Sequence, residues 1–286
     1  MAERAVGETP PRVMTIAGTD SGGGAGVAAD LRALAACGVH GCVAVTAVTV
    51  QNSVAVTGVH VLPPETVAAQ IEVVATDIGL NAVKTGMLAS AGIITAVAEV
   101  CDRVGIGAER RTPFVVDPVA ASMSGEQLLA DDALDAFRTL LFPRATVLTP
   151  NLPEVRLLTG IDVHDRDAQY AAAKALHAMG PRWVLVKGGH LEEDVDECVD
   201  LLFDGTTFTE FPGPRIVTGN THGGGDTMAS AIAAGLARGL PVPEAVGAAK
   251  RFVTESVRRS YDLGRGHGPV SPLWAVRRWW GGDGAI

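Results

Sequence analysis

The chain has 286 residues, of which 47% are hydrophobic and 19% charged, a composition that excludes an intrinsically disordered protein. Its formal net charge of −9 argues against nucleic acid or an anionic membrane surface as the main partner. Every apolar run is broken well before the ~18 residues that a transmembrane helix needs. The N-terminus lacks the apolar core of a secretory signal, and the four cysteines include no C-x-x-C pair. We therefore expect a cytoplasmic protein with reduced thiols.

Short apolar runs alternate with segments of helical spacing along most of the chain. In chain order, the patterns predict a strand over 13–17, a helix over 24–37, a strand buried on both faces over 42–50, a helix over 66–75, a strand over 82–85, a helix over 91–104, a strand over 114–116, a helix over 133–141, a strand over 146–149, a helix over 168–179, a strand over 183–187, a hairpin within 198–211, and helices over 226–238 and 243–258.

This alternation is typical of βαβ crossovers, which build a parallel sheet covered by helices on both faces. We expect an α/β protein with three layers, α/β/α, around a central and mostly parallel sheet. No linker or repeat divides the chain, so we predict one domain over 13–280. Residues 1–12 are expected to form a disordered tail and residues 281–286 a frayed one. The three tryptophans at 274, 279 and 280 are expected to dock a last helix.

Polar and glycine-rich segments follow several of the predicted strands. Ligands of open parallel sheets bind beyond the carboxyl ends of the strands, so these segments are candidate site residues. The segment from Gly18 to Gly26 either cradles a phosphate or forms a flexible turn before a helix. Gln51 follows the second strand, and its amide could pair with an amino group beside a ring nitrogen. A solvated glutamine is the alternative.

Three further strand ends carry charged or amide side chains. Asp117 follows the strand over 114–116, Asn151 and Glu154 follow the strand over 146–149, and Lys187 ends the strand over 183–187. Mg²⁺ is typically held by one or two carboxylates together with substrate phosphates, and lysine suits phosphate as a point charge. Their predicted convergence on one edge of the sheet suggests a magnesium–nucleotide site.

The strongest signal is the run from Asn220 to Thr227, which leads directly into an alanine-rich helix. Backbone N–H groups of Gly223, Gly224 and Gly225, together with the positive end of the helix, would form an anion hole. Asp226 could be a simple helix N-cap or a catalytic group. Three consecutive glycines favour the catalytic interpretation, because they let the backbone approach a ligand closely.

With these residues assembled, the chain resembles the ribokinase-like kinases, and among them the hydroxymethylpyrimidine/phosphomethylpyrimidine kinases of thiamine biosynthesis. The resemblance extends over roughly 13–269. It rests on the stretches 15–21, 29–31, 46–52, 84–88, 117–119, 149–154, 187–190, 220–223 and 266–269, which occur in the family's order. It implies a ribokinase-like fold and an enzyme that uses Mg-ATP to phosphorylate 4-amino-5-hydroxymethyl-2-methylpyrimidine, and then its monophosphate. Such kinases are commonly homodimers.

The resemblance also implies roles for individual residues. Gln51 matches the residue that pairs with the aminopyrimidine edge. Glu154 matches the acid linked to Mg²⁺ and phosphate placement, and Asp117 is a second candidate ligand of the metal. The other matches are Gly18, Asp30 and Met87 around the ring, and Asn151, Lys187 and Thr221 on the ATP side.

Two positions depart from the family pattern. Asp226 stands where these kinases usually have cysteine, and it restores the aspartate that serves as the base of the sugar-kinase branch. Met123 stands where the family usually has a lysine before Ser124 and Gly125. We expect Asp226 to accept the proton of the substrate's hydroxymethyl group. We also expect a slower second transfer, because the ionised aspartate repels a phosphorylated substrate and a possible compensating lysine is absent.

Three other functions compete with this one. A pyridoxal or pyridoxine kinase is the nearest, because its ring also carries a hydroxymethyl group, although Gln51 favours an aminopyrimidine. A sugar kinase is disfavoured because we see no strand-rich insertion in the first βα unit. A non-catalytic pyrimidine-binding protein would be expected to have lost at least one of Asp226, Glu154 and Lys187.

Overall fold

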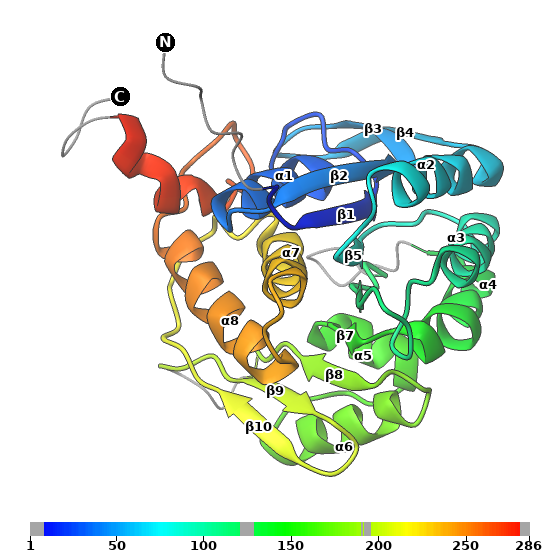
Figure 1. Cartoon of the computed structure of the whole chain (residues 1–286). Helices are drawn as coiled ribbons and strands as arrows, with labels where there is room; N and C mark the ends of the chain where they lie inside the picture. Colours follow the sequence, from blue (N-terminus) through cyan, green and yellow to red (C-terminus); the bar gives the residue numbers. More distant parts are fainter. Residues whose placement is uncertain (1–8, 121–128, 190, 192–195, 281–286) are drawn as a thin grey trace.

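The computed structural model describes residues 9–120, 129–189, 191 and 196–280, with the backbone alone for 277–280 (Figure 1). The strands are β1 (Arg12–Ala17), β2 (His40–Val45), β3 (Ala47–Gln51), β4 (Val56–Val61), β5 (Ala82–Thr85), β6 (Phe114–Val116), β7 (Val147–Leu148), β8 (Trp183–Val186), β9 (Asp200–Phe203) and β10 (Phe208–Phe211). The α-helices are α1 (Gly26–Ala36), α2 (Pro64–Asp77), α3 (Ala91–Val104), α4 (Asp131–Ala136), α5 (Leu152–Thr159), α6 (Arg166–His177), α7 (Gly224–Ala237) and α8 (Val242–Arg258).

Eight of these strands form one central sheet in the order β10-β9-β8-β7-β6-β5-β1-β2. The pairs from β2 to β8 are parallel, whereas β9 and β10 join antiparallel at one end. The prediction of a central, mostly parallel sheet is therefore confirmed. Because the parallel strands all run the same way, their carboxyl ends meet at one edge, where ligands of such sheets bind.

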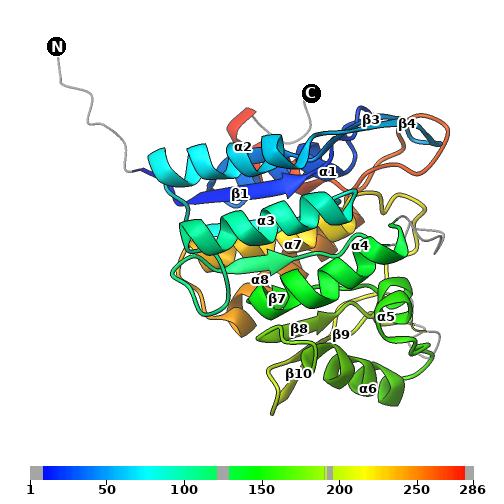
Figure 2. The same ribbon diagram turned by 90° about the vertical axis from the view of Figure 1, so that its right-hand side faces the viewer.

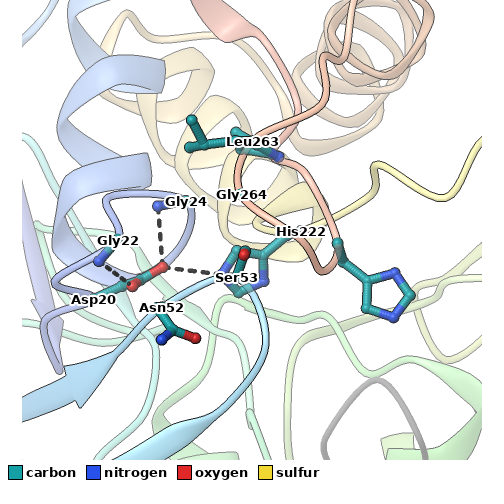
Figure 3. Close-up of a pocket in the computed structure, with 10 residues that line it drawn as sticks. Asp20, Gly22, Gly24, Asn52, Ser53, His222, Leu263 and Gly264 are labelled. Carbon is teal, nitrogen blue, oxygen red and sulfur yellow. Dashed lines mark hydrogen bonds and ion pairs between the residues drawn. The ribbon is translucent and has the colours of Figure 1, made fainter.

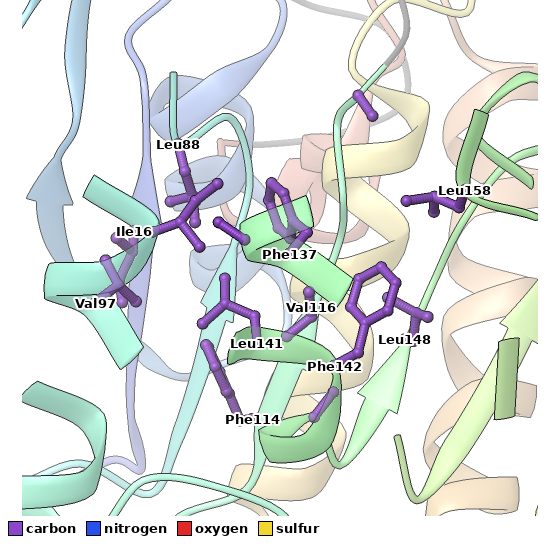
Figure 4. Close-up of a cluster of buried hydrophobic side chains, with 14 of the residues drawn as sticks. Ile16, Leu88, Val97, Phe114, Val116, Phe137, Leu141, Phe142, Leu148 and Leu158 are labelled. Carbon is purple, nitrogen blue, oxygen red and sulfur yellow. The ribbon is translucent and has the colours of Figure 1, made fainter. Parts of the chain in front are cut away.

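Alternate residues of each strand face opposite layers of helices. Met14 and Ile16 of β1 join the core under α2 to α6, while Val13, the residue before Met14, joins the core under α1, α7 and α8. Figure 1 shows α7 and α8 on one side of the sheet and α3 and α4 on the other, and Figure 2 looks onto the sheet with α3 and α4 in front. Figure 4 shows the larger core, in which Phe114 and Phe137 pack with aliphatic side chains from several elements. The sheet is thus sealed on both faces, and its accessible polar groups lie at the strand ends.

The predicted strand over 42–50 is two strands in the structure. The chain leaves the central sheet at Thr46, and β3 then pairs antiparallel with β4 in a separate two-stranded sheet. Thr46 fixes this break, because its N–H donates to the Ala17 carbonyl and its hydroxyl to the Met87 carbonyl. The expected burial on both faces is wrong for β3, where Val48 and Val50 are exposed. The strand β4 was not predicted, so strands do extend the connection after β2.

Three other elements differ from expectation. The helix expected over 133–141 is α4 followed by a π-helical turn, η1 (Phe137–Leu141), and a short 3-10 turn, η2 (Phe142–Arg144). The helix α5 was not predicted. The C-terminal tryptophans lie in a 3-10 segment, η3 (Pro272–Trp280). Arg12 already belongs to β1 and the Pro11 carbonyl accepts from the His40 N–H, so the predicted disordered tail does not reach these two residues. Residues 1–8 and 281–286 lie outside the described part. Within the described residues, no helix is long and apolar enough to cross a membrane.

Candidate active site

The candidate site is built at the carboxyl edge of the central sheet, around the first turn of α7. Gly223 is the N-cap of this helix and has φ 76°, in the left-handed region that favours glycine. A Cβ at Gly223 would also lie 2.1 Å from the carbonyl oxygen of Gly24. Glycine is therefore required here by backbone strain and by the close approach of the segment after β1. The turn leaves the first amides of α7 without intrahelical partners, as an anion site needs.

Asp226 lies in this first turn and is held at both of its oxygens. Its Oδ1 lies 3.0 Å from Nζ of Lys84, and its Oδ2 accepts a hydrogen bond of 3.2 Å from the N–H of Gly26. Burial opposes ionisation of Asp226, but the Lys84 ammonium and the Gly26 amide outweigh it and lower the pKa of the carboxyl. Its side chain retains 16% exposure. Asp226 is thus an ionised, partly accessible carboxylate, as a general base must be.

Asp30 lies behind Lys84 and has no exposed surface. Its Oδ1 lies 2.8 Å from Lys84 Nζ and accepts a hydrogen bond of 2.7 Å from Ser230, while its Oδ2 accepts one of 2.6 Å from Thr15. Burial raises the pKa of the carboxyl to about 6. The predicted contact of Asp30 with the substrate ring stays a prediction that this geometry does not favour. The arrangement favours a supporting role for Asp30 through Lys84.

A second pair of charges lies between β6 and β8. Lys187 forms an ion pair of 3.0 Å with Oδ1 of Asp117, which also accepts a hydrogen bond from Thr149. Burial favours the neutral amine of Lys187, but Asp117 and Glu154 reverse that effect and raise the pKa of the ammonium. A Cβ at Gly225 would lie 3.4 Å from Lys187 Nζ and 3.6 Å from Asp117 Oδ2. The structure therefore brings this pair to the first turn of α7.

Asn151 and Glu154 form the capping box that starts α5. The Asn151 side chain accepts from the Glu154 N–H at 2.9 Å, and Glu154 Oε2 accepts from the Asn151 N–H at 2.8 Å. Glu154 Oε1 also accepts from the N–H of Ala120 at 3.3 Å. Burial raises the pKa of Glu154 to about 7, despite the nearby Lys187 ammonium. The spacing Asn-x-x-Glu thus has a clear structural function, and a direct role in binding ATP or Mg²⁺ stays a prediction.

The glycine-rich segment after β1 is organised by its own aspartate. The Asp20 carboxylate accepts hydrogen bonds from the N–H groups of Gly22, Gly24 and Ala25, at distances between 2.8 and 3.0 Å. His222 Nε2 lies 2.9 Å from Asp20 Oδ2 and so ties this segment to the turn before α7. Three amides of the possible phosphate cradle are therefore already occupied by Asp20. Sequence reasoning missed this link, because the two residues lie 202 positions apart.

The residues predicted to surround the substrate ring are only partly brought together. Gly18 and Met87 are neighbours, since a Cβ at Gly18 would lie 2.5 Å from Met87 Cε. Gln51 lies at the far end of β3, where its N–H donates to the hydroxyl of Ser21. Thr221 is exposed, and its carbonyl accepts from the N–H of Gly224. Met123 and His190 lie outside the described residues.

A cavity of about 300 Å³ opens beside these elements, between the glycine-rich segment, the β3–β4 turn and the segment over 263–269 (Figure 3). Asp20 and His222 meet at its wall, and the close-up shows the bonds from Asp20 to the Gly22 and Gly24 amides. Its other lining residues are Asn52, Ser53, Leu263, Gly264, His267 and Pro269. Neither Asp226 nor Gln51 lines the cavity, so it adjoins the candidate site without containing its charged groups.

Sequence reasoning also gave no role to Lys84. A signal was present, because a lysine in the middle of the buried strand β5 is stable only if acids pair with it. The sequence alone does not identify those acids. They come from α1 and α7, which are separated from β5 by 54 and 142 positions.

Known proteins resemble the chain over nearly its whole length. A family profile described as phosphomethylpyrimidine kinase matches residues 20–271. Hydroxymethylpyrimidine/phosphomethylpyrimidine kinase of Mycobacterium leprae is 59% identical over 272 residues, 94% of this chain and 96% of that protein. A thiamine biosynthesis bifunctional protein of Geobacter sulfurreducens is 46% identical over 264 residues, 92% of this chain and 52% of that protein.

The similarity extends to solved structures. The ADP complex of Bacillus subtilis pyridoxal kinase has a TM-score of 0.85 at 35% identity and covers 94% of this chain and 99% of that one. This confirms the expected ribokinase-like α/β fold. Because the family profile spans most of the chain and a 59% identical relative matches almost end to end, the chain belongs to the phosphomethylpyrimidine kinase family.

Proposed function

We propose that the chain transfers the γ-phosphoryl group of ATP to 4-amino-5-hydroxymethyl-2-methylpyrimidine, and then to its monophosphate, in thiamine biosynthesis. The observation that carries the proposal is the position of the Asp226 carboxylate, which lies in the first turn of α7 beside the glycine amides and pairs with Lys84 at 3.0 Å. Family membership supports the kinase activity and the use of ATP as phosphoryl donor. The names of the relatives from Mycobacterium leprae and Geobacter sulfurreducens support the substrate and the thiamine pathway.

In the first transfer, Asp226 is the general base. The hydroxyl proton of the substrate passes to an Asp226 oxygen while the hydroxyl oxygen attacks the γ-phosphorus of ATP. The bond from that phosphorus to the β,γ-bridging oxygen breaks, and ADP leaves. The hydrogen bond from the Gly26 N–H holds one oxygen of the carboxylate in place before the substrate arrives.

The turn over Gly223 to Gly225 stabilises the charge that develops on the moving phosphoryl group. The Gly223 and Gly225 amides and the positive end of α7 favour anions, whereas the Gly224 N–H already donates to the Thr221 carbonyl. Lys187 lies against Gly225 and adds an ammonium to the same place. Its 15% exposure leaves it accessible to the phosphates of a nucleotide.

The residues at this edge fit a magnesium ion that is shared with a nucleotide. No group of three or more acidic, histidine or cysteine side chains in the described residues could hold a metal alone. Mg²⁺ usually takes only one or two carboxylates and completes its shell with phosphate oxygens and water. Asp117 and Glu154 would supply those carboxylates, and the raised pKa of Glu154 agrees with a site that favours an added positive charge. Bound there, Mg²⁺ would neutralise charge on the nucleotide phosphates.

Gln51 is the proposed selector of the ring. A carboxamide can donate to a ring nitrogen and accept from the adjacent amino group, which an aminopyrimidine offers and pyridoxal lacks. The half-buried side chain of Gln51 lies at the end of β3, next to the bulge between Val50 and Gln51. The overall similarity to a pyridoxal kinase makes pyridoxal the second substrate to test.

A time course tests the function directly. The chain is incubated with Mg-ATP and the hydroxymethylpyrimidine, with a parallel reaction on pyridoxal, and the mono- and diphosphates are separated. We expect monophosphate first, then diphosphate, and little turnover of pyridoxal. Turnover of pyridoxal alone would contradict the assignment through Gln51 but leave the phosphoryl-transfer site intact. Binding of the pyrimidine without ATP hydrolysis would instead favour a non-catalytic binding protein.

We also propose that the enzyme is a cytoplasmic homodimer. Six valines on and around the β3–β4 hairpin are 43–62% exposed, which is unusual for a monomer surface: Val48, Val50, Val54, Val56, Val59 and Val61. Sedimentation velocity of the double variant Val50→Glu/Val59→Glu should show monomers. Val73→Glu, on the exposed face of α2, is the matched control and should leave the dimer unchanged. The free, reduced state of all four cysteines agrees with a cytoplasmic location.

A further inference from the structure

Lys84 has a place in the site that the proposed transfer does not yet use. Its side chain is wholly buried in the central strand β5, and its ammonium lies between Asp30 and Asp226, at 2.8 and 3.0 Å. We propose that Lys84 is a positioning residue that keeps Asp226 ionised and oriented, and that Asp30 anchors the Lys84 ammonium for this task. The inference rests on the proposed function, in which Asp226 is the base.

The anchor is assembled from elements that are distant in sequence. Asp30 from α1 accepts hydrogen bonds from Thr15 of β1 and Ser230 of α7, in addition to its contact with Lys84 of β5. Both oxygens of Asp30 are therefore committed, and the ammonium has one fixed position. A buried ammonium is stable in the folded protein only when its acidic partners are in place. The position of Asp226 is thereby coupled to the packing of the central sheet.

Charge, as well as position, is set by this arrangement. The groups that face Asp226 are Lys84 and, beyond it, Asp30, together with Lys187 on the other side of the turn. Burial raises the pKa of Asp30 to about 6, whereas the pKa of Asp226 is lowered. The ammonium therefore favours the ionised form of Asp226, while burial opposes ionisation of Asp30. Asp226 stays available as a base.

A second buried lysine distinguishes a positioning role from a merely structural one. Lys250 of α8 forms an ion pair of 2.9 Å with Asp200 and donates to the Cys198 carbonyl. None of its hydrogen bonds or ion pairs in the described residues involves Asp226 or Lys84. Removing Lys250 leaves an unpaired buried acid just as removing Lys84 does. Lys250→Met is therefore the matched control for Lys84→Met.

The test measures the electrostatic effect of Lys84 without any kinase activity. Asp226→Cys places a thiol in the first turn of α7, and its pKa is read from the pH dependence of its alkylation by iodoacetamide, followed by mass spectrometry of the peptide containing position 226. The native cysteines interfere little, because burial raises the pKa of each of them: Cys37, Cys42, Cys101 and Cys198. Since only the thiolate reacts, a neighbouring ammonium shifts the curve to lower pH.

The thiol pKa is expected to shift in opposite directions when Lys84 or Asp30 is replaced. In the Asp226→Cys background, Lys84→Met should raise the thiol pKa by about one unit or more. Asp30→Asn should lower it, because the amide oxygen can still accept from Lys84 while the negative charge that balances the ammonium is removed. Lys250→Met should leave it unchanged. Equal thiol pKa values with and without Lys84 would overturn the proposal. If Lys84→Met does not fold, a thiol pKa that Asp30→Asn fails to lower would do the same. The thiol pKa can be measured even if the chain has no kinase activity, so failure of the proposed function and failure of this inference are distinguishable.

Discussion

Two lysines at the same sheet edge have the same kind of partner and very different surroundings. Lys84 and Lys187 each lie 3.0 Å from an aspartate, Asp226 and Asp117, and nearby acids raise the pKa of both ammonium groups. Lys84 is fully buried beneath the first turn of α7, while Lys187 is 15% exposed beside it. The difference shows how one chemistry serves two tasks. The sealed lysine acts on a neighbouring side chain, and the accessible lysine can act on a ligand.

Each lysine is also accompanied by a second, buried acid. Asp30 supports Lys84, and Glu154 lies near Lys187 while it caps α5. Burial raises the pKa of both acids, to about 6 and about 7. The two clusters therefore differ mainly in the access of their lysines, and most of the variants below remove one group from one of them.

Asp226→Asn should have the largest effect, because it removes the general base from the cluster around Lys84. We expect turnover to fall by roughly 10²–10⁴-fold, the usual contribution of a general base, while the affinity for the pyrimidine is kept. Steady-state kinetics and equilibrium binding of the pyrimidine measure the two effects. The isosteric amide keeps the side-chain shape, which makes misfolding a weak explanation. Turnover near that of the unmodified enzyme would remove Asp226 from its proposed role.

Lys187→Met should act on the nucleotide rather than on the pyrimidine. The loss of one charge-assisted contact is worth about 1.5–3 kcal/mol, so we expect the KM for ATP to rise by roughly 10–100-fold. The KM for the pyrimidine should change little. Lys250→Met removes a buried lysine that pairs with Asp200 rather than with Asp117 and serves as control. A selective loss of pyrimidine affinity in Lys187→Met would mean that the two clusters have been assigned the wrong way round.

Gln51→Ala tests whether ring recognition is separate from both lysines. The variant should raise the KM for the pyrimidine by roughly tenfold and lower kcat much less, because it removes binding that is equal in the ground and transition states. Asn52→Ala, at the neighbouring position, is a matched control for disturbance of the β3–β4 turn. Unchanged affinity for the ring in Gln51→Ala would contradict the pairing.

The second transfer should be slower relative to the first, by a few-fold, because its substrate brings a phosphate towards the ionised Asp226. Asp226→Cys removes that repulsion when the thiol is neutral, so the ratio of second to first rates should rise even if both fall. Single-turnover assays starting from the pyrimidine and from its monophosphate give the ratio. A ratio that is unchanged, or close to one in the unmodified enzyme, would refute the repulsion argument.

The sequence predicts the order of strands and helices better than the points at which a strand is interrupted. The strand Ala82–Thr85, the helix Ala91–Val104 and the strand Phe114–Val116 have the predicted bounds, because clear patterns and a left-handed Gly105 delimit them. The break at Thr46 was missed, since β-branched residues continue through it and only tertiary hydrogen bonds, to Ala17 of β1 and to Met87 after β5, fix it.

Site residues follow the same logic. The charged residues after each strand were recognisable, because topology alone brings strand ends to one edge. The partners of Lys84 were not recognisable, since Asp30 and Asp226 reach it from helices that tertiary packing positions. The Asn-x-x-Glu spacing at 151–154 was interpreted as a ligand set, although it is also the pattern of a helix capping box.

The smallest predicted effect concerns the stability of the folded state and the cluster around Lys187. The pKa of Glu154 is about 7 in the folded chain, above its ordinary value of 4.5, because burial disfavours the carboxylate. The folded state therefore holds this proton more tightly than the unfolded state. The stabilisation is fully present below about pH 4.5 and is lost as pH rises through about 7. Asp30 contributes with the same sign up to about pH 6.

We thus expect the Tm of the ligand-free chain to fall between pH 4.5 and 7. Glu154→Gln should flatten part of this slope, because the amide cannot ionise, while Glu99→Gln on the exposed face of α3 should not. Differential scanning calorimetry at constant ionic strength measures the slopes. If Glu154→Gln leaves the dependence of Tm on pH unchanged, ionisation of Glu154 does not destabilise the folded state. The pH dependence of Tm would then come from Asp30, which pairs with Lys84, and Asp30→Asn would be the variant that removes it.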